Sequence, residues 1–168
     1  MILIGLPGSG KTAVASWLAD QTDSIIISRD TIKRALFGRH DVGVSQNALA
    51  FEVMKMAIPV STTLAQLVIL DGMPFSRVGQ VEAVRDIAAT NGIESIPVFL
   101  DCSIESAQDR LQIVDPEGPY DRDADLVSRV ADEFREIPSS WLRVNADNSL
   151  NHVRDEVWTS LESQGAVS

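Results

Sequence analysis

The sequence predicts an α/β fold in three layers, α/β/α, in which helices cover both faces of a five-stranded parallel sheet. Five short apolar segments alternate along the chain with stretches of helical character. Most of these segments are continuously apolar, which is typical of strands buried on both faces of a parallel sheet. The alternation of strand and helix favours right-handed crossovers and hence the three-layer arrangement.

The expected strands are residues 1–4, 24–27, 67–70, 96–100 and 141–144, and the expected helices are residues 11–20, 31–37, 45–64, 77–90, 104–112, 124–135 and 150–161. Asn91-Gly92 is expected to end the fourth helix, and Ser103 to cap the fifth. Pro59 is expected to kink or split the third.

The first expected strand leads directly into a glycine-rich loop, Gly5-Leu6-Pro7-Gly8-Ser9-Gly10-Lys11-Thr12. The loop matches the phosphate-binding pattern G-x-x-x-x-G-K-[ST]. Its glycines permit positive φ values, so that backbone N–H groups of residues 8–12 can point at a polyphosphate at the start of a helix. Lys11 is expected to reach the β- and γ-phosphates and the Thr12 hydroxyl to ligate Mg²⁺. The loop therefore predicts binding of a nucleoside triphosphate.

The second expected strand is followed by Ser28-Arg29-Asp30-Thr31. Ligands of open α/β sheets bind at the carboxyl ends of the strands, so Asp30 is expected near the γ-phosphate, where it can accept a proton from an attacking hydroxyl. An alternative role for Asp30 is to cap the helix that begins at Thr31, and the two roles are compatible. Positive charge is concentrated nearby, in Arg29, Lys33, Arg34, Arg39 and His40.

The third expected strand ends in Asp71-Gly72. An aspartate at this place fits the acidic position that holds Mg²⁺ directly or through water, although an ordinary turn aspartate is the alternative. The fourth strand also ends in an aspartate, Asp101, for which a cap or turn role is favoured. Cys102 is expected to be a buried or half-buried residue rather than a nucleophile.

Length and composition predict one domain over residues 1–168 in a reducing cytoplasm. No apolar run is long enough for a membrane span. The net charge of −10 lies almost entirely in residues 101–168, which weighs against broad nucleic-acid binding. The acidic and proline-containing segment 114–123 is either a surface connection or part of a short lid around residues 112–123.

The order of the motifs GLPGSGKT, IIISRDTIKRALFG, VILDG and VFLDC-SIESAQDRL resembles the small P-loop kinases related to polynucleotide kinases, zeta toxins and chloramphenicol phosphotransferase. The resemblance covers residues 1 to about 158 and implies an AAA-type, nucleoside-kinase-like P-loop NTPase domain. It implies that Asp30 is the general base. The family usually has an arginine three residues later that grips the acceptor or the phosphate, and this chain has Lys33 there with Arg34 next to it.

The resemblance also implies lid arginines that stabilise the transferring phosphoryl group. Arg110 matches the first, with a solvated salt bridge as the alternative role. A second arginine usually follows within a turn, and here Arg122 could replace it. Arg77 resembles an arginine on the acceptor side. The base of the bound nucleotide is expected between Arg110 and residues 138–145.

Together these features predict an ATP- and Mg²⁺-dependent phosphotransferase that acts on a hydroxyl of a small-molecule acceptor. The overall acidity favours a neutral or cationic acceptor. A polynucleotide 5′-hydroxyl kinase is the first alternative, supported by the basic cluster at 29–39, and a nucleotide-gated regulatory ATPase is the second. A monomer or homodimer is expected. The apolar wall of the acceptor site is expected to come from Phe37, Phe51, Met54 and Met73, unless these residues only fill the core.

Overall fold

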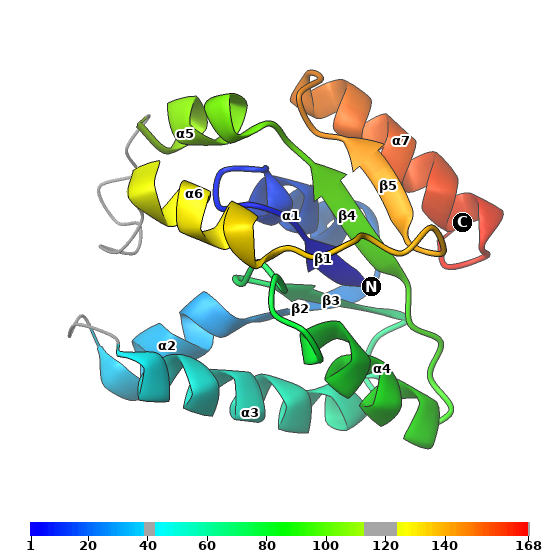
Figure 1. Ribbon diagram of the computed structural model, residues 1–168. Helices are drawn as coiled ribbons and strands as arrows, with labels where there is room; N and C mark the ends of the chain where they lie inside the picture. Colours follow the sequence, from blue (N-terminus) through cyan, green and yellow to red (C-terminus); the bar gives the residue numbers. More distant parts are fainter. Residues whose placement is uncertain (39–42, 113–123, 168) are drawn as a thin grey trace.

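Five parallel strands form one sheet in the order β2-β3-β1-β4-β5 (Figure 1). The computed structural model describes residues 1–38, 43–112 and 124–167. The strands are β1 (Ile2–Ile4), β2 (Ser24–Ser28), β3 (Leu67–Asp71), β4 (Pro97–Asp101) and β5 (Leu142–Asn145). The predicted fold class, a three-layer α/β/α arrangement around a five-stranded parallel sheet, is confirmed.

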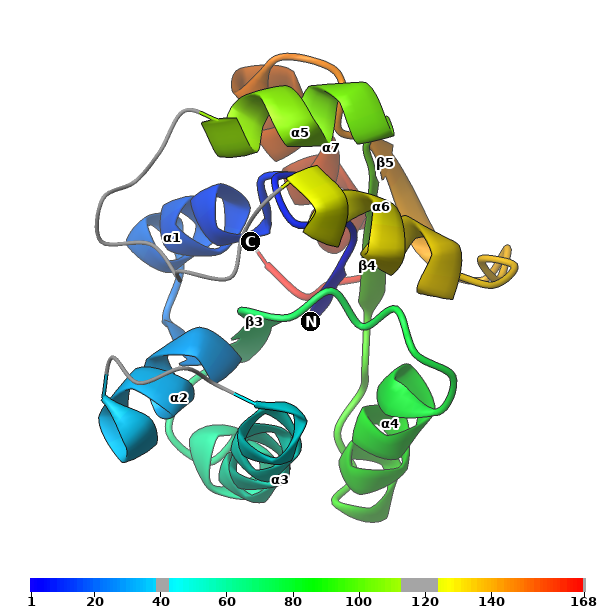
Figure 2. The ribbon, with the colours of Figure 1, turned by 60° about the vertical axis from the view of Figure 1, so that its left-hand side comes forward.

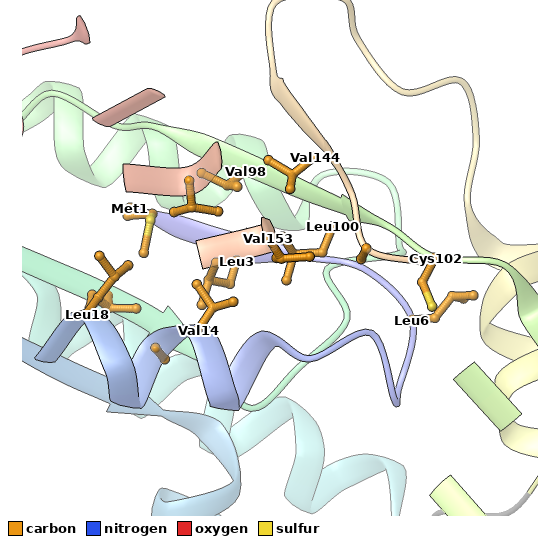
Figure 3. Close-up of a cluster of buried hydrophobic side chains, with 14 of the residues drawn as sticks. Met1, Leu3, Leu6, Val14, Leu18, Val98, Leu100, Cys102, Val144 and Val153 are labelled. Atoms are coloured by element: carbon orange, nitrogen blue, oxygen red, sulfur yellow. The ribbon is translucent and has the colours of Figure 1, made fainter. Parts of the chain in front are cut away.

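Successive residues of the central strands point into two different cores. In β1, Leu3 belongs to one buried cluster, whereas Ile2 and Ile4 belong to the other. In β4, Val98 and Leu100 likewise alternate with Phe99. Figure 3 shows the first cluster, in which these strand residues meet side chains of the helices on one face of the sheet. Because both faces are buried, the strands carry continuous apolar runs.

The helices are α1 (Lys11–Gln21), α2 (Arg29–Phe37), α3 (Val44–Ser61), α4 (Gln80–Thr90), α5 (Ile104–Gln112), α6 (Ala124–Glu133) and α7 (Leu150–Ser163). Helices α1 and α7 pack on the face of the first cluster, and α3 and α4 on the face of the second. Helix α2 packs against α3, and α5 packs against α6 near the carboxyl ends of the strands (Figures 1 and 2).

Several helix boundaries differ from the sequence prediction, those of α4, α3 and α6 among them. Helix α4 begins at Gln80 instead of Arg77, because Gly79 has a left-handed φ of 84° and the Gln80 side chain accepts a hydrogen bond from the Arg77 N–H. Helix α3 continues unbroken past Pro59 to Ser61. The proline lies in the last turn, and the helix is not split there. Helix α6 ends two residues early, at Glu133.

The predicted caps of the neighbouring helices are confirmed. Helix α4 ends at Thr90, and Gly92 follows with a φ of 67°. The N–H of Ile93 donates to the Ala88 carbonyl across this turn, at 2.8 Å. The Ser103 hydroxyl accepts from the Ser106 N–H at the start of α5. Across the described ranges, no helix is both long and apolar enough to cross a bilayer.

Substitution of Leu18 by alanine should destabilise the protein by about 2–5 kcal/mol, because Leu18 is fully buried between α1 and the sheet and its removal leaves a cavity. Urea denaturation measures this loss. Leu64 is 69% exposed, and Leu64→Ala, the matched control, should change the free energy of unfolding by less than about 0.5 kcal/mol. Equal effects of the two substitutions would contradict this assignment of the core.

Candidate functional site

A cleft of about 1380 Å³ opens at the carboxyl ends of the strands. Its lining comes from the loop before α1, from the α2 to α4 region, from α5 and α6, and from residues 146–150. In Figure 2 the helices α5 and α6 lie together above α2, α3 and α4. Every described candidate residue except Gly5 lines this cleft, namely Gly8, Ser9, Gly10, Lys11, Thr12, Asp30, Lys33, Arg34, Asp71, Arg77 and Arg110. The fold thus brings together residues as far apart in sequence as Gly8 and Arg110.

The glycine-rich loop takes a conformation that side chains would prevent. Gly8 has a φ of 86°, and a Cβ there would overlap the carbonyl of Ala107 in α5. Gly10 has a φ of 94° immediately before α1, with open space around it. Gly5, which does not line the cleft, anchors the loop through its N–H to the Pro74 carbonyl at 3.1 Å. The loop is therefore fixed between the exit of β3 and the body of α5.

The Lys11 side chain folds back into the loop and is buried. Its Nζ donates to the carbonyls of Gly5, at 2.9 Å, and Leu6, at 2.7 Å, and lies 3.4 Å from the Ser9 hydroxyl. These bonds keep the ammonium group inside the loop. A cation held there can contact the terminal oxygens of a polyphosphate wrapped by the loop.

Thr12 and Asp71 form a pair across the bottom of the cleft. The Thr12 hydroxyl donates to Asp71 Oδ2 at 2.9 Å, and the Asp71 side chain is only 2% exposed. Asp71 Oδ1 is buried and has no hydrogen-bond partner within the part of the chain that the structure describes. A buried carboxylate oxygen without a donor beside a hydroxyl fits an additional cation or water, and both groups are ligands that Mg²⁺ accepts.

No group of three or more His, Cys, Asp or Glu residues in the described ranges could hold a metal ion by itself. An ion at Thr12 and Asp71 would therefore take its remaining ligands from phosphate oxygens and water, as is usual for Mg²⁺ in nucleotide sites.

Asp30 stands in the first turn of α2, next to the end of β3. The helix begins at Arg29, and its cap is Ser28, whose hydroxyl accepts from the Thr31 N–H at 3.4 Å. The capping alternative for Asp30 is therefore wrong. A Cβ on Gly72 would lie 2.7 Å from the Ser28 hydroxyl and 2.8 Å from the Asp30 nitrogen. Only glycine allows this close packing, which brings the start of α2 next to Asp71.

The two cations of α2 have different surroundings. Lys33 is buried, and its Nζ lies 3.9 Å from Asp30 Oδ1, one helical turn away. Arg34 is exposed on the wall of the cleft. Lys33 is thus placed to orient the Asp30 carboxylate, whereas Arg34 faces the space that a ligand would fill.

Arg110 projects from α5 to the end of β4. Its Nη1 lies 3.7 Å from the Cys102 sulfur. The alternative role of Arg110, a salt bridge on a solvated helix face, is not observed, because it forms no ion pair within residues 1–38, 43–112 and 124–167. Burial raises the pKa of the Cys102 thiol to about 11, although the Arg110 charge opposes this shift. The thiol is therefore protonated at neutral pH, in agreement with a structural role.

Asp147 connects the loop after β5 to the start of α5. It accepts hydrogen bonds from the N–H and the hydroxyl of Ser103, both at 3.0 Å. The backbone hydrogen bond from Ser103 is the main cause that lowers the pKa of the Asp147 carboxyl.

Asp101, expected to act as a cap or in a turn, instead pairs with Arg143, whose Nη2 lies 2.7 Å from its Oδ2. Residues 146–150 line the cleft, whereas none of residues 138–145 does. The position of the nucleotide base stays a prediction.

Glu133 is a cleft residue that the sequence analysis missed. From the last turn of α6 it accepts the Ser76 hydroxyl at 2.5 Å on Oε2 and both Nε and Nη2 of Arg77 at 3.1 Å on Oε1. Arg129, one turn earlier on α6, also lines the cleft. The i, i+4 spacing of these two charges on an amphipathic helix was visible in the sequence, but such spacing also describes a plain solvated face.

Of the expected apolar wall, Phe51 and Met73 line the cleft, whereas Met54 is a fully buried core residue and Phe37 does not reach the cleft. Arg122, Arg39 and His40 lie outside the described residues, as does the expected lid from residue 113 onward.

The chain is similar to a known protein family and to several solved structures. A family model described as AAA domain matches residues 1–137. Similar solved structures include the APS kinase CysC of Mycobacterium tuberculosis in complex with AMPPNP and APS, with 20% identity, 96% of each chain covered and a TM-score of 0.63. A gluconokinase from Sinorhizobium meliloti is 13% identical, with 97% of this chain and 91% of that chain covered and a TM-score of 0.67.

The protein APE1195 has a TM-score of 0.72 at 20% identity, with 96% of this chain and 93% of that chain covered. A search of the curated proteins found no match. At these identities the structural likeness establishes the fold. The APS kinase and the gluconokinase are both kinases, in agreement with the kinase-type enzyme expected from the motifs. Because the family model covers most of the sequence, from the first strand to beyond α6, the chain belongs to the AAA domain family.

Proposed function

We propose that the protein is an ATP-dependent kinase that transfers the γ-phosphoryl group of ATP to a hydroxyl of a small-molecule acceptor. The observation that carries this proposal is the position of Asp30. It lines the same cleft as the phosphate loop, while Ser28 caps α2 in its place. A carboxylate that is not needed as a cap is suited to accept a proton from an attacking hydroxyl.

The phosphate donor, ATP, would bind at the glycine-rich loop and at Asp71. The backbone N–H groups of residues 8–12 and the Lys11 ammonium would bind the phosphates, and Thr12 and Asp71 would hold Mg²⁺. The bound ion would offset negative charge on the β- and γ-phosphates. The APS kinase named above was solved with AMPPNP, which supports ATP as the donor here. Arg110, and Arg122 from outside the described residues, would stabilise charge on the transferring group.

In the transfer step, the acceptor oxygen forms a bond to the γ-phosphorus as the bond to the β–γ bridging oxygen breaks. The proton of the acceptor hydroxyl passes to Asp30. Lys33 would orient the Asp30 carboxylate through the 3.9 Å contact, and Arg34 would contact the acceptor or the phosphate from the cleft wall. Phosphoryl transfer depends mainly on such positioning and charge stabilisation.

Incubation with ATP, Mg²⁺ and a library of hydroxyl compounds tests this function through ADP release. Certain acceptors should raise the rate above slow hydrolysis. Lys11→Ala should lower that rate by about 10²- to 10³-fold, because a preorganised cation at the phosphates is lost. Lys55→Ala is the matched control, since Lys55 pairs with Glu52 outside the cleft.

The outcome also separates the alternatives. One slow rate with every acceptor would favour a regulatory ATPase. Stimulation by oligonucleotides, with binding that weakens steeply as salt rises, would favour a polynucleotide kinase. The oligomeric state and the cytoplasmic location stay predictions.

Asp30→Asn should lower kcat with the best acceptor by between about 10- and 10⁴-fold, because the amide cannot accept the proton. The affinity for AMPPNP, measured by calorimetry, should stay close to that of the wild type. Asp86→Asn on the exposed surface of α4 is the control and should leave kcat unchanged. Transfer that survives undiminished in Asp30→Asn would remove Asp30 from its assigned role.

Asp71→Asn should raise the Mg²⁺ concentration needed for half-maximal activity by about tenfold or more, because the buried pair with Thr12 loses its charge. Thr12→Val should act in the same direction, whereas Thr12→Ser keeps the hydroxyl and should stay near the wild type. Titration of Mg²⁺ at saturating ATP gives these values. Identical Mg²⁺ curves for all four proteins would show that the ion is held elsewhere.

A further inference from the structure

The cleft also contains a group of hydrogen-bond donors that converge on one carboxylate. Ser76 Oγ, Arg77 Nε and Arg77 Nη2 all contact the Glu133 side chain, at 2.5, 3.1 and 3.1 Å. Ser76 is buried, and its hydroxyl donates to the Glu133 carboxylate. Three donors from one short segment that meet on an anionic group form an oxyanion-binding site, and Glu133 is its internal ligand.

This site lies on the path of the acceptor. The segment that carries Ser76 and Arg77 begins at Gly72, which packs directly against Asp30. Residues 72–74, 76 and 77 all line the cleft together with Asp30. A compound whose hydroxyl lies at Asp30 is therefore flanked by this segment.

Glu133 does not use the full capacity of Arg77. Both guanidinium N–H groups contact the same oxygen, Oε1, while Oε2 is taken by Ser76. A guanidinium is built to bind two oxygens of one anion side by side. An external carboxylate, phosphate or sulfate could give Arg77 two oxygens and still leave an acceptor for Ser76.

A second cation stands next to this site. Arg129 is exposed on the cleft wall, four residues before Glu133 and on the same face of α6. Arg34 faces the cleft from α2. Three arginines thus surround the acceptor space of a chain whose net charge is −10.

Building on the kinase function proposed above, we propose that the acceptor carries an anionic group, a carboxylate or a phosphate or sulfate ester, and that Ser76 and Arg77 bind it at the place now held by Glu133. Arg129 adds positive charge to the bound state. The acceptor is then a hydroxyl compound with an oxyanion at its other end.

The test compares pairs of hydroxyl compounds that differ in the anionic group: glycerate and glycerol, gluconate and sorbitol, glycerol 3-phosphate and glycerol. Acceptor-dependent ADP release should be confined to anionic members, and the carboxylate and phosphate pairs show which anion is preferred. Arg77→Gln should lower kcat/KM for the active anionic compound by about 10- to 100-fold, chiefly through KM. Glu133→Gln, which removes the competing charge, should lower KM severalfold.

Arg85→Gln is the matched control, because Arg85 is exposed on α4 and does not line the cleft. It should behave like the wild type. Equal use of neutral and anionic partners, or an Arg77→Gln protein as active as the Arg85→Gln control, would overturn the proposal.

A binding measurement separates this proposal from the kinase function. Calorimetry with inorganic sulfate, with and without saturating AMPPNP–Mg²⁺, should show a site that Arg77→Gln loses and Arg85→Gln keeps. That result supports the anion site even if no acceptor ever raises ADP release above the Lys11→Ala blank, a failure that would count against the kinase function alone. Sulfate titrations that are identical for the two variants would overturn the anion site even if neutral acceptors are phosphorylated.

Discussion

The central position of β1 in the sheet is the constraint on which the site depends. With β1 between β3 and β4, the chain leaves β1 toward α1 on one face of the sheet and leaves β3 toward α4 on the other. A crevice forms where neighbouring strands send their connections in opposite directions. The phosphate loop and Asp71 meet in this crevice, and the hydrogen bond from Thr12 joins them.

The alignment of β2 with β3 extends the same constraint to Asp30. Ser28 pairs in register with Asp71, so the two strands end at the same level. Gly72 then lets the first turn of α2 pack against the end of β3 without an intervening side chain. A larger residue at 72 would separate the proposed base from the proposed metal position.

The sequence was most informative where function depends on local chemistry. The loop, Asp30, Asp71 and Arg110 each follow a strand or stand on a recognisable helix, and parallel strands bring such ends together by necessity. Glu133 was not predictable in this way, because its role depends on a contact with Arg77 across 56 positions of the chain. The beginning of α4 depended on the left-handed φ of Gly79, which glycine permits but does not require. The lining at 146–150 followed from where β5 ends.

The net charge of the whole chain and the charges that face the cleft favour different acceptors. The excess of acidic residues argued for a neutral or cationic acceptor, whereas the acceptor space itself is faced by Arg34, Arg77 and Arg129. Exposed charges beyond about 10 Å are screened at physiological ionic strength, so nearby groups dominate recognition.

An exposed ion pair contributes about 0–1 kcal/mol, and the side chains of Arg77 and Glu133 are 62% and 33% exposed. Their pairing is therefore easy to exchange for a ligand. The buried Ser76 hydroxyl is different, because leaving it without a partner costs about 1–3 kcal/mol. A ligand that replaces Glu133 must satisfy both groups, which favours an oxyanion with several acceptor oxygens over a single hydroxyl.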